Sequence, residues 1–385
     1  MKKIIVFCLL MFGCFALFQN NFILVGADEL TDNINNQLEN IDLSGLESYF
    51  NNVKGLPEGI DFFTYLIGLL NGTFNVDFNS FTTYFVNVFM SDVKDVMPMF
   101  ISLFAIAIFC GIVQNLRSSF LSESIGDLIL FVCLLSIILI LSAHIIALIK
   151  DVEIIIKNIA NLTEIMSPII ITLMLASGGK VSASVYKPSV TFLSNGVIDI
   201  FLFAIIPLVG LFTVFNTMTS FSNTIRLTKF SELTVSTIKW IIGLTVTVFG
   251  VFLSVQGITS ATFDGISIKA TKYAISNSVP LVGGLLKDGF DMVIAGSVLI
   301  KNAVGITSLI ALLFTLLNPV LYLWAFSFLL KVVSAITEPI TDVRISSFFM
   351  SMSKTVTYLT VILLAVGLMF FITIMLLIMS ANAFL

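Results

Sequence analysis

The sequence predicts an all-α, polytopic membrane protein. Hydrophobic residues make up 58% of the 385 residues and charged residues only 11%, and the mean hydropathy is +1.08. A chain with so few polar side chains cannot cover its apolar surface in water. Several uncharged runs also reach the length of about 20 residues that a helix needs to cross a bilayer.

The N-terminal segment, residues 1–27, has the features of a secretory signal peptide. Lys2 and Lys3 precede an apolar run, and small or β-branched residues stand before Asp28, as is typical of a cleavage site. The alternative is an uncleaved first membrane anchor.

Residues 28–96 form a strongly acidic segment, with eleven acidic residues against two lysines. Segments poor in positive charge are found outside the cytoplasm, so we expect this one to be extracytoplasmic. Apolar residues recur in it at helical spacing, and Ser44 to Glu47 fits a capping box that would begin a helix. The segment has too few aliphatic residues for a core of its own, so we expect its short helices to lie on the membrane surface or against a partner.

Residues 97–385 form the membrane domain, with six firm spans and two shorter segments. The shorter ones are 165–176, which contains Pro168, and 279–300, which glycines and charges interrupt. Interrupted apolar segments are a weak pointer to transport sites. If both are re-entrant the domain has six spans, and if both cross it has eight. The firm spans are expected at 97–115, 128–149, 197–218, 240–258, 304–330 and 355–381.

The three arginines distinguish the two topologies, because positive residues concentrate in cytoplasmic loops. Arg117, Arg226 and Arg344 all face the cytoplasm if there are six spans, whereas the loop with Arg226 faces outward if there are eight. The C-terminus is outside the cytoplasm in both topologies.

The stretch 273–305 combines features that a simple anchor does not need. Charges in or beside a membrane segment are costly and turn toward protein or water, and small residues recurring on one face permit close helix approach. Asp288 and Asp291 share a helix face suited to a cation, although Lys287 and Asp291 also have the spacing of an ion pair. We expect Asp199, near the start of the third span, to face protein. The candidate conduit or packing residues are Pro280, Gly283, Gly284, Lys287, Asp288, Gly289, Asp291, Gly296, Lys301, Asn302, Gly305 and Asp199.

Patterns for catalysis or cofactor binding are not found. The one histidine, His144, has no second histidine at a metal-binding spacing and is expected to reach the membrane interface from the end of a helix. The sequence contains neither of the glycine-rich phosphate motifs GxxxxGK[ST] and GxGxxG, and the four cysteines indicate no disulfide framework. We therefore predict no enzyme activity, cofactor, metal or nucleic-acid binding. Asn318-Pro319 predicts a kink in the fifth span, and Glu338 to Arg344 an ordered cytoplasmic turn.

A run of motifs in the second half of the chain resembles a known family. The motifs are Leu253-Ser254-Val255-Gln256-Gly257, Tyr273 to Asn277, Val279 to Gly283 and Leu299 to Gly305. Together with the signal peptide and the acidic segment, they resemble stage III sporulation protein AE of endospore-forming Firmicutes. The resemblance covers essentially the whole chain and is most specific over 253–305.

The resemblance implies a role in a complex that joins the mother cell to the engulfed forespore. Its partners would be a cytoplasmic secretion-type ATPase, small membrane subunits, and ring-forming proteins that meet a forespore partner. The chain would lie in the mother-cell-derived outer forespore membrane, as the export gate or conduit of the complex. The alternatives are an autonomous secondary transporter or transporter permease, in which Asp288, Asp291 and Lys301 bind substrate, and a non-conducting scaffold.

Overall fold

The structure is a computed structural model that describes residues 34, 37–38, 41–53, 62–70, 78–120, 123–221, 227–278 and 283–380. Every regular element in these residues is a helix, and six helices are long and apolar enough to cross a membrane. The predicted all-α membrane fold is therefore confirmed. The predicted signal peptide and Pro280 lie outside the described residues.

In the described part of the chain short helices precede the long ones, and the long ones form antiparallel hairpins. The short helices are α3 (Ser44–Asn51) and α4 (Phe62–Leu70). The first hairpin consists of α5 (Phe78–Phe120) and α6 (Glu123–Ala176). The last three helices are α10 (Thr228–Ser278), α11 (Gly283–Thr337) and α12 (Val343–Met379).

The third long rod is a composite of α-helical and π-helical segments. In order they are α7 (Lys180–Thr191), η1 (Phe192–Val197), α8 (Ile198–Ile200), η2 (Phe201–Ile205) and α9 (Ile206–Phe221). A π-helical turn contains an extra residue, so the side chains that follow it are rotated relative to an uninterrupted α-helix. The two π-helical segments thus change which residues of this rod face the rest of the bundle.

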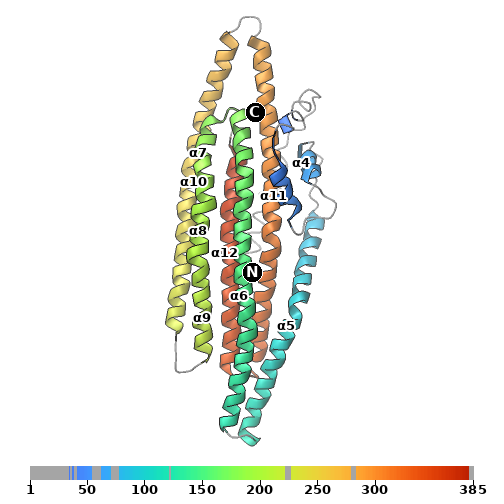
Figure 1. Ribbon diagram of the computed structural model, residues 1–385, viewed down its shortest axis with the longest axis vertical. Coiled ribbons are helices and arrows are strands. Elements are labelled where there is room, and N and C mark those ends of the chain that lie inside the picture. The colour runs from blue at the N-terminus through green and yellow to red at the C-terminus, as the bar shows by residue number, and fades with distance from the viewer. Residues whose placement is uncertain are drawn as a thin grey trace.

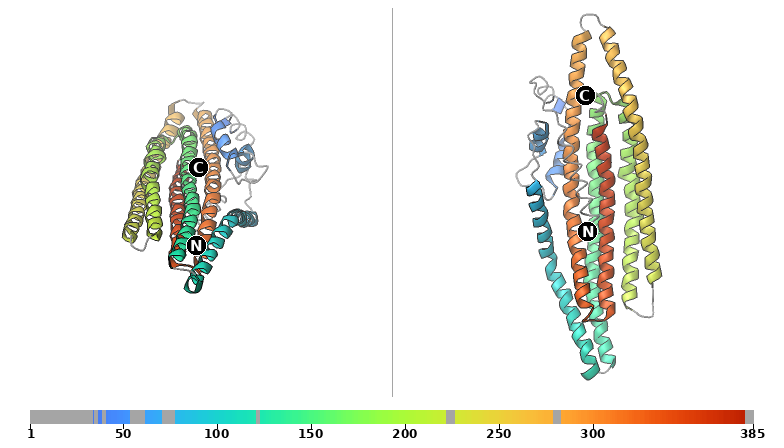
Figure 2. Two further views of the ribbon diagram at one scale, coloured as in Figure 1. Left: turned by 60° about the horizontal axis from the view of Figure 1, so that its bottom comes forward. Right: turned by 180° about the vertical axis from the view of Figure 1, so that it is seen from behind.

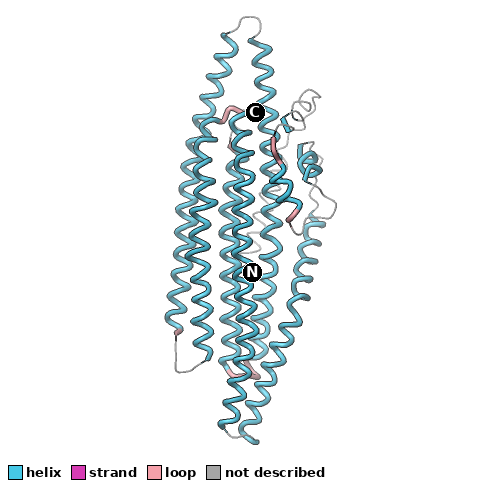
Figure 3. The backbone as a smooth tube through the Cα atoms, in the orientation of Figure 1, coloured by secondary structure: helices cyan, strands magenta, loops and turns pink. Residues whose placement is uncertain are grey.

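The long helices run nearly parallel to one axis (Figures 1 and 2). α6, α11 and α12 lie at the centre and pack on one another, α5 packs on α6 and α11, and the rod from α7 to α9 packs with α10 on the opposite side. The end of α10 and the start of α11 extend beyond the ends of the other helices (Figure 3). The bundle thus has a central three-helix core, one flanking helix and a flanking two-helix layer.

The two short segments of the sequence prediction are parts of longer helices. Residues 165–176 are the last turns of α6, and Gly283 to Ile300 are the first turns of α11. The sequence interpretation separated 165–176 from its helix because Lys150, Asp151 and nearby charges interrupt the apolar run, but charged side chains do not break a helix. The structure therefore has six long rods, with neither segment as a separate crossing.

The long helices exceed the thickness of a membrane. α11 has 55 residues, which at a rise of about 1.5 Å each extend about 80 Å, whereas a bilayer core is about 30 Å thick. Each rod contains a stretch without charged residues that is long enough to cross this core. These stretches are 96–116, 128–149, 200–221, 240–263, 302–330 and 355–379.

Small and hydroxyl side chains hold α11 against α12. A Cβ added at Gly305 would lie 2.3 Å from Cγ1 of Ile378, and one at Gly367 would lie 2.3 Å from Cδ1 of Leu316. Farther along the pair, the hydroxyl of Ser353 donates to the carbonyl of Ser327 at 3.0 Å, and the hydroxyl of Ser334 donates to the carbonyl of Ser346 at 2.8 Å. Close approach at small residues and hydrogen bonds between helices are characteristic of packing in membranes.

The described short helices of the acidic segment, α3 and α4, pack on the protein's own helices, so no separate partner is needed to supply their core. Phe50 of α3 and Phe62 of α4 are fully buried, with ring centroids 5.8 Å apart. Both short helices contact α11, so the bundle supplies the core that the segment lacks. α3 begins at Ser44 as predicted, but the predicted capping box does not form; Asp42 accepts hydrogen bonds from the backbone N–H and hydroxyl of Ser44 at 3.1 and 2.5 Å.

The turn between α11 and α12 is ordered, as predicted. Asp342 is the N-cap of α12 and accepts the backbone N–H of Arg344 at 2.8 Å and its side-chain Nε at 3.0 Å. Burial favours the neutral form of Asp342, but the hydrogen bonds and charge of Arg344 outweigh it and hold the pKa of Asp342 below its ordinary value. The carboxylate is therefore ionised at neutral pH and anchors the start of α12.

A polar cavity as the candidate functional site

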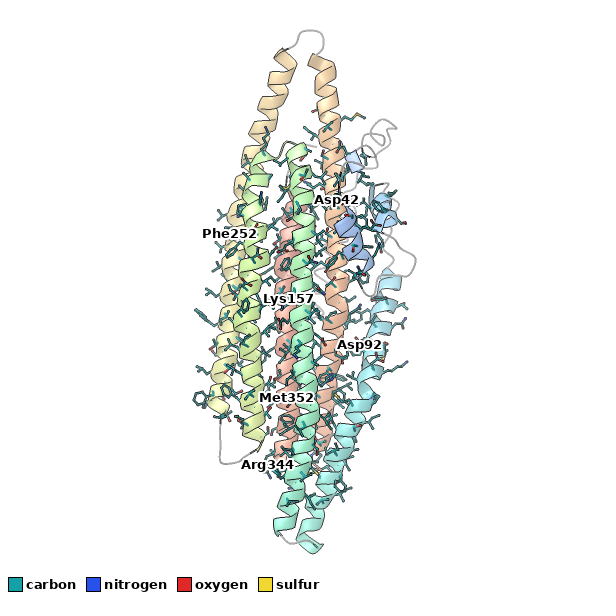
Figure 4. The ribbon with its side chains drawn as sticks, in the orientation of Figure 1. Asp42, Asp92, Lys157, Phe252, Arg344 and Met352 are labelled. Atoms are coloured by element: carbon teal, nitrogen blue, oxygen red, sulfur yellow. The ribbon has the colours of Figure 1, made fainter. Side chains whose placement is uncertain are left out.

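A cavity of about 800 Å³ lies between α3, α5, α6 and α11, and it is open on one side. Its walls combine carboxylates, carboxamides and hydroxyls with apolar side chains. Figure 4 labels Asp92, which belongs to its lining, on α5. The polar lining residues are Ser48, Tyr49, Asn52, Asp92, Asp151, Asn158, Asn161, Thr315, Asn318 and Tyr322.

Helical spacing brings these polar residues to one place. On α6, Asp151, Asn158 and Asn161 are separated by seven and three residues, so they share one face of the helix. On α11, Thr315 and Asn318 fall on one face by the same rule. Helices α6 and α11 pack side by side, so the two polar faces lie next to each other, and α3 and α5 close the sides.

Hydrogen bonds between elements fix the walls of the cavity. The hydroxyls of Tyr49 and Thr315 lie 3.2 Å apart and join α3 to α11. The hydroxyl of Tyr84 on α5 donates to Oδ1 of Asn318 at 3.1 Å. Pro319 follows directly and lacks a backbone donor, so this part of α11 relies on side-chain contacts with its neighbours.

His144 lies beside the cavity and not at the end of a helix, where it was predicted. Its Nε2 is 3.2 Å from the hydroxyl of Tyr322, and its ring stacks on Phe326 with centroids 4.8 Å apart. α6 continues for many residues past His144 instead of ending near it, so the imidazole packs within the bundle. Its hydrogen bond orients Tyr322 at the cavity wall.

The cavity is acidic. Asp92 and Asp151 line it, and none of the described lining residues is a lysine, arginine or histidine. One carboxylate oxygen of Asp92, Oδ2, is buried and has no hydrogen-bond partner in the described part of the chain. A buried carboxylate oxygen is costly without a donor or a counter-charge, so the site favours a cationic or hydrogen-donating occupant. The described ranges contain no group of three or more His, Cys, Asp or Glu side chains that could hold a metal ion.

Lys301, a candidate conduit or packing residue, binds the end of α12 inside the bundle. Its side chain is fully buried, and its ammonium donates to the backbone carbonyl of Ser380, directly after α12. A cation at the C-terminus of a helix satisfies a free carbonyl and interacts favourably with the helix dipole. Asn302 beside it is half-buried and Gly296 is buried.

Helices approach closely at the candidate packing residue Gly305, whereas Gly289 has no such neighbour. Gly289 is exposed, and a Cβ added there would meet nothing within 4 Å, because this part of α11 extends beyond most of the bundle. Asp291 is half-buried, and nearby the side chain of Gln37 binds the carbonyl of Val293 and the hydroxyl of Ser297 at 3.4 and 3.0 Å. The side chains of Lys287 and Asp288 are not described, nor are the surroundings of Gly283 and Gly284.

Asp199, which was expected to face protein, does not face the other described helices of this chain. It lies in α8 between the two π-helical segments and is exposed on the outer surface of the rod. The preceding segment η1 adds a residue to its turn, and one residue corresponds to a rotation of about 100° in an α-helix. Lys187, which precedes Asp199 on the same rod, is also exposed, and the described residues contain no ion pair between the two.

The cavity was not predicted from the sequence because its four walls are far apart in the chain. Residue 45 is the first lining residue and residue 323 the last. One signal was present, since Asn318-Pro319 was identified as an interruption of an apolar span. A second was available in the polar face of α6, where Asp151, Asn158 and Asn161 recur at helical spacing beyond the apolar run.

Comparisons with known proteins give one consistent result. The sequence model of the family described as stage III sporulation protein AE matches residues 60–381. The stage III sporulation protein AE of Bacillus subtilis (strain 168) is 27% identical over 282 residues, which cover 73% of this chain and 70% of the relative. No solved structure matches the chain.

Proposed function

Because the chain belongs to the stage III sporulation protein AE family, we propose that it is a membrane subunit of the envelope-spanning complex that links mother cell and forespore. The observation that carries this proposal is the family match across a bundle with six membrane-spanning rods. The complex would include a cytoplasmic ATPase, small membrane subunits and ring-forming proteins, and this chain would be its export gate or conduit.

The distribution of arginines supports an orientation for the bundle. The end of α5, where Arg117 lies, the end of α9 and the start of α10, between which Arg226 falls in the sequence, and the start of α12 with Arg344 are all at the same end of the bundle. Positive residues concentrate on the cytoplasmic side, so this end would face the mother-cell cytoplasm. The opposite end, with α3, α4 and the projecting tips of α10 and α11, would face the space between the two membranes.

Two further features support a subunit over an autonomous protein. The tips of α10 and α11 project past the other helices (Figure 1), which suits contact with ring-forming proteins in the intermembrane space. Asp199 is exposed at the edge of an uncharged stretch, where a carboxylate facing lipid is unfavourable, so a neighbouring membrane subunit would stabilise it.

The polar cavity favours the second candidate function, an autonomous transporter.

Purification from sporulating cells tests the proposed function. An affinity-tagged copy at the native locus is expected to bring down the ATPase and the ring-forming proteins after engulfment, and deletion is expected to block spore development at that stage. Transport by the isolated, reconstituted chain that Asp291→Asn abolishes would instead favour the autonomous transporter. A chain that purifies alone from engulfed cells would contradict the proposal.

Labelling of single cysteines tests the orientation. In a background with the native cysteines replaced, Arg226→Cys is expected to resist a membrane-impermeant maleimide in intact cells and to react after permeabilisation. Asp264→Cys, in the projecting part of α10, is expected to react in intact cells because its end of the bundle is extracytoplasmic. Reaction of Arg226→Cys from outside would reject the six-rod topology.

A further inference from the structure

We infer that the cavity between α3, α5, α6 and α11 binds a small organic cation that carries ammonium groups on an aliphatic chain, such as a polyamine. This inference is independent of the proposed function, because it concerns a ligand of the single chain and not its assembly with other subunits. It rests on three properties of the lining, which are its charge, its acceptors and its apolar surface.

The lining of the cavity is negatively charged, which favours a cationic ligand. Asp92 and Asp151 face the cavity from two different helices, and the described lining contains no basic side chain. Lys157 does not compensate them, because it does not line the cavity and its ammonium pairs with Glu153 at 2.7 Å. The buried oxygen of Asp92 that lacks a hydrogen-bond partner can thus accept from a donor, and a cation between the two carboxylates would be attracted by both.

The acceptors of the lining fit an ammonium group. Carboxamide oxygens of Asn52, Asn158 and Asn161 and the hydroxyl of Ser48 accompany the two carboxylates. An ammonium group donates three hydrogen bonds and accepts none, so it can use a carboxylate and two neighbouring acceptors together. These acceptors are spread over three helices, which matches a ligand with more than one ammonium group better than a single point charge.

The remaining lining explains why the cation should be organic. A metal ion needs several ligands within about 2–2.6 Å, and no such grouping of acidic, histidine or cysteine side chains exists in the described residues. The cavity volume of about 800 Å³ falls in the range of small-molecule sites. Apolar side chains of Leu148, Val152, Ile155 and Leu323 lie among the polar ones, and they would pack against the methylene groups of an alkyl chain.

Equilibrium dialysis with radiolabelled spermidine tests the inference. The full chain in phosphatidylcholine nanodiscs, which carry no net negative lipid charge, is expected to bind spermidine saturably, with empty nanodiscs as the background. Asp92→Asn and Asp151→Asn should each weaken binding at least about tenfold, since a hydrogen bond to a charged group is lost. The control Glu338→Gln removes an exposed carboxylate in the turn between α11 and α12 that does not line the cavity, and it should leave binding unchanged.

A gain-of-charge variant keeps the test valid if the asparagine variants fold poorly. Asn161→Asp adds a carboxylate to the lining and is expected to tighten spermidine binding. Unsaturable binding, equal binding by wild type and Asp92→Asn, or weakening by Glu338→Gln to the same extent would each overturn the inference. Competition by calcium or magnesium ions at lower concentrations than unlabelled spermidine would also overturn it, because the site would then be inorganic.

Discussion

Replacing Gly111 with alanine is expected to destabilise the bundle by about 1–3 kcal/mol, the usual cost of overpacking. The new Cβ would lie 2.4 Å from the backbone carbonyl oxygen of Ile340 and 2.9 Å from its Cγ2. A side chain can rotate away from such a contact, but a backbone carbonyl in the turn between α11 and α12 cannot. The turn would have to move away from α5, and the anchoring of α12 by Asp342 would move with it.

A loss of stability in Gly111→Ala would be informative because a glycine-to-alanine substitution within a helix otherwise stabilises it, by about 1 kcal/mol. Gly250 in α10 is the matched control, since a Cβ added there meets no atom within 4 Å and it also lies in an uncharged stretch. Unfolding of both variants in mixed micelles with increasing dodecyl sulfate, followed by circular dichroism, gives the comparison. Equal or greater stability of Gly111→Ala than of Gly250→Ala would show that α5 does not pack closely on this turn.

The class of the fold could be predicted from composition and from the length of the apolar runs. Uncharged apolar runs of about 20 residues have few alternatives to spanning a membrane, and the structure contains a long rod at each of the six predicted places. Helix continuity was harder to predict. Lys150 and Asp151 end the apolar run on α6, yet the helix continues, and Glu153 and Lys157 beyond them form an ion pair of the kind that supports a helix. Hydropathy therefore marks where the membrane ends and not where the helix ends.

The candidate site could be predicted only in part, because it depends on contacts between distant residues. The sequence identified Lys301 and Gly305 as unusual, and the structure places both at contacts with the end of α12. It could not show that Tyr49 of the acidic segment reaches Thr315 of α11, since the two are 266 positions apart. The cavity follows from that contact, because α3 forms one of its walls.

Lys301→Met is expected to release the end of α12. Methionine is similar in length and apolar, so it fills the space, but it cannot donate to the carbonyl of Ser380. The loss of a hydrogen bond from a charged group costs about 1.5–3 kcal/mol, and the carbonyl is left in a buried position. Hydrogen exchange should therefore accelerate in the last turns of α12, and the free energy of unfolding should fall by a similar amount.

The control distinguishes a structural role of Lys301 from a role in a conduit. Lys331 is on the same helix but is exposed, so Lys331→Met should leave both exchange and unfolding nearly unchanged. A buried lysine also carries a desolvation cost, and its removal relieves that cost. If Lys301→Met protects the end of α12 as well as wild type does, this relief outweighs the lost hydrogen bond. The capping role would then be wrong, and the interpretation of Lys301 as a conduit residue would remain.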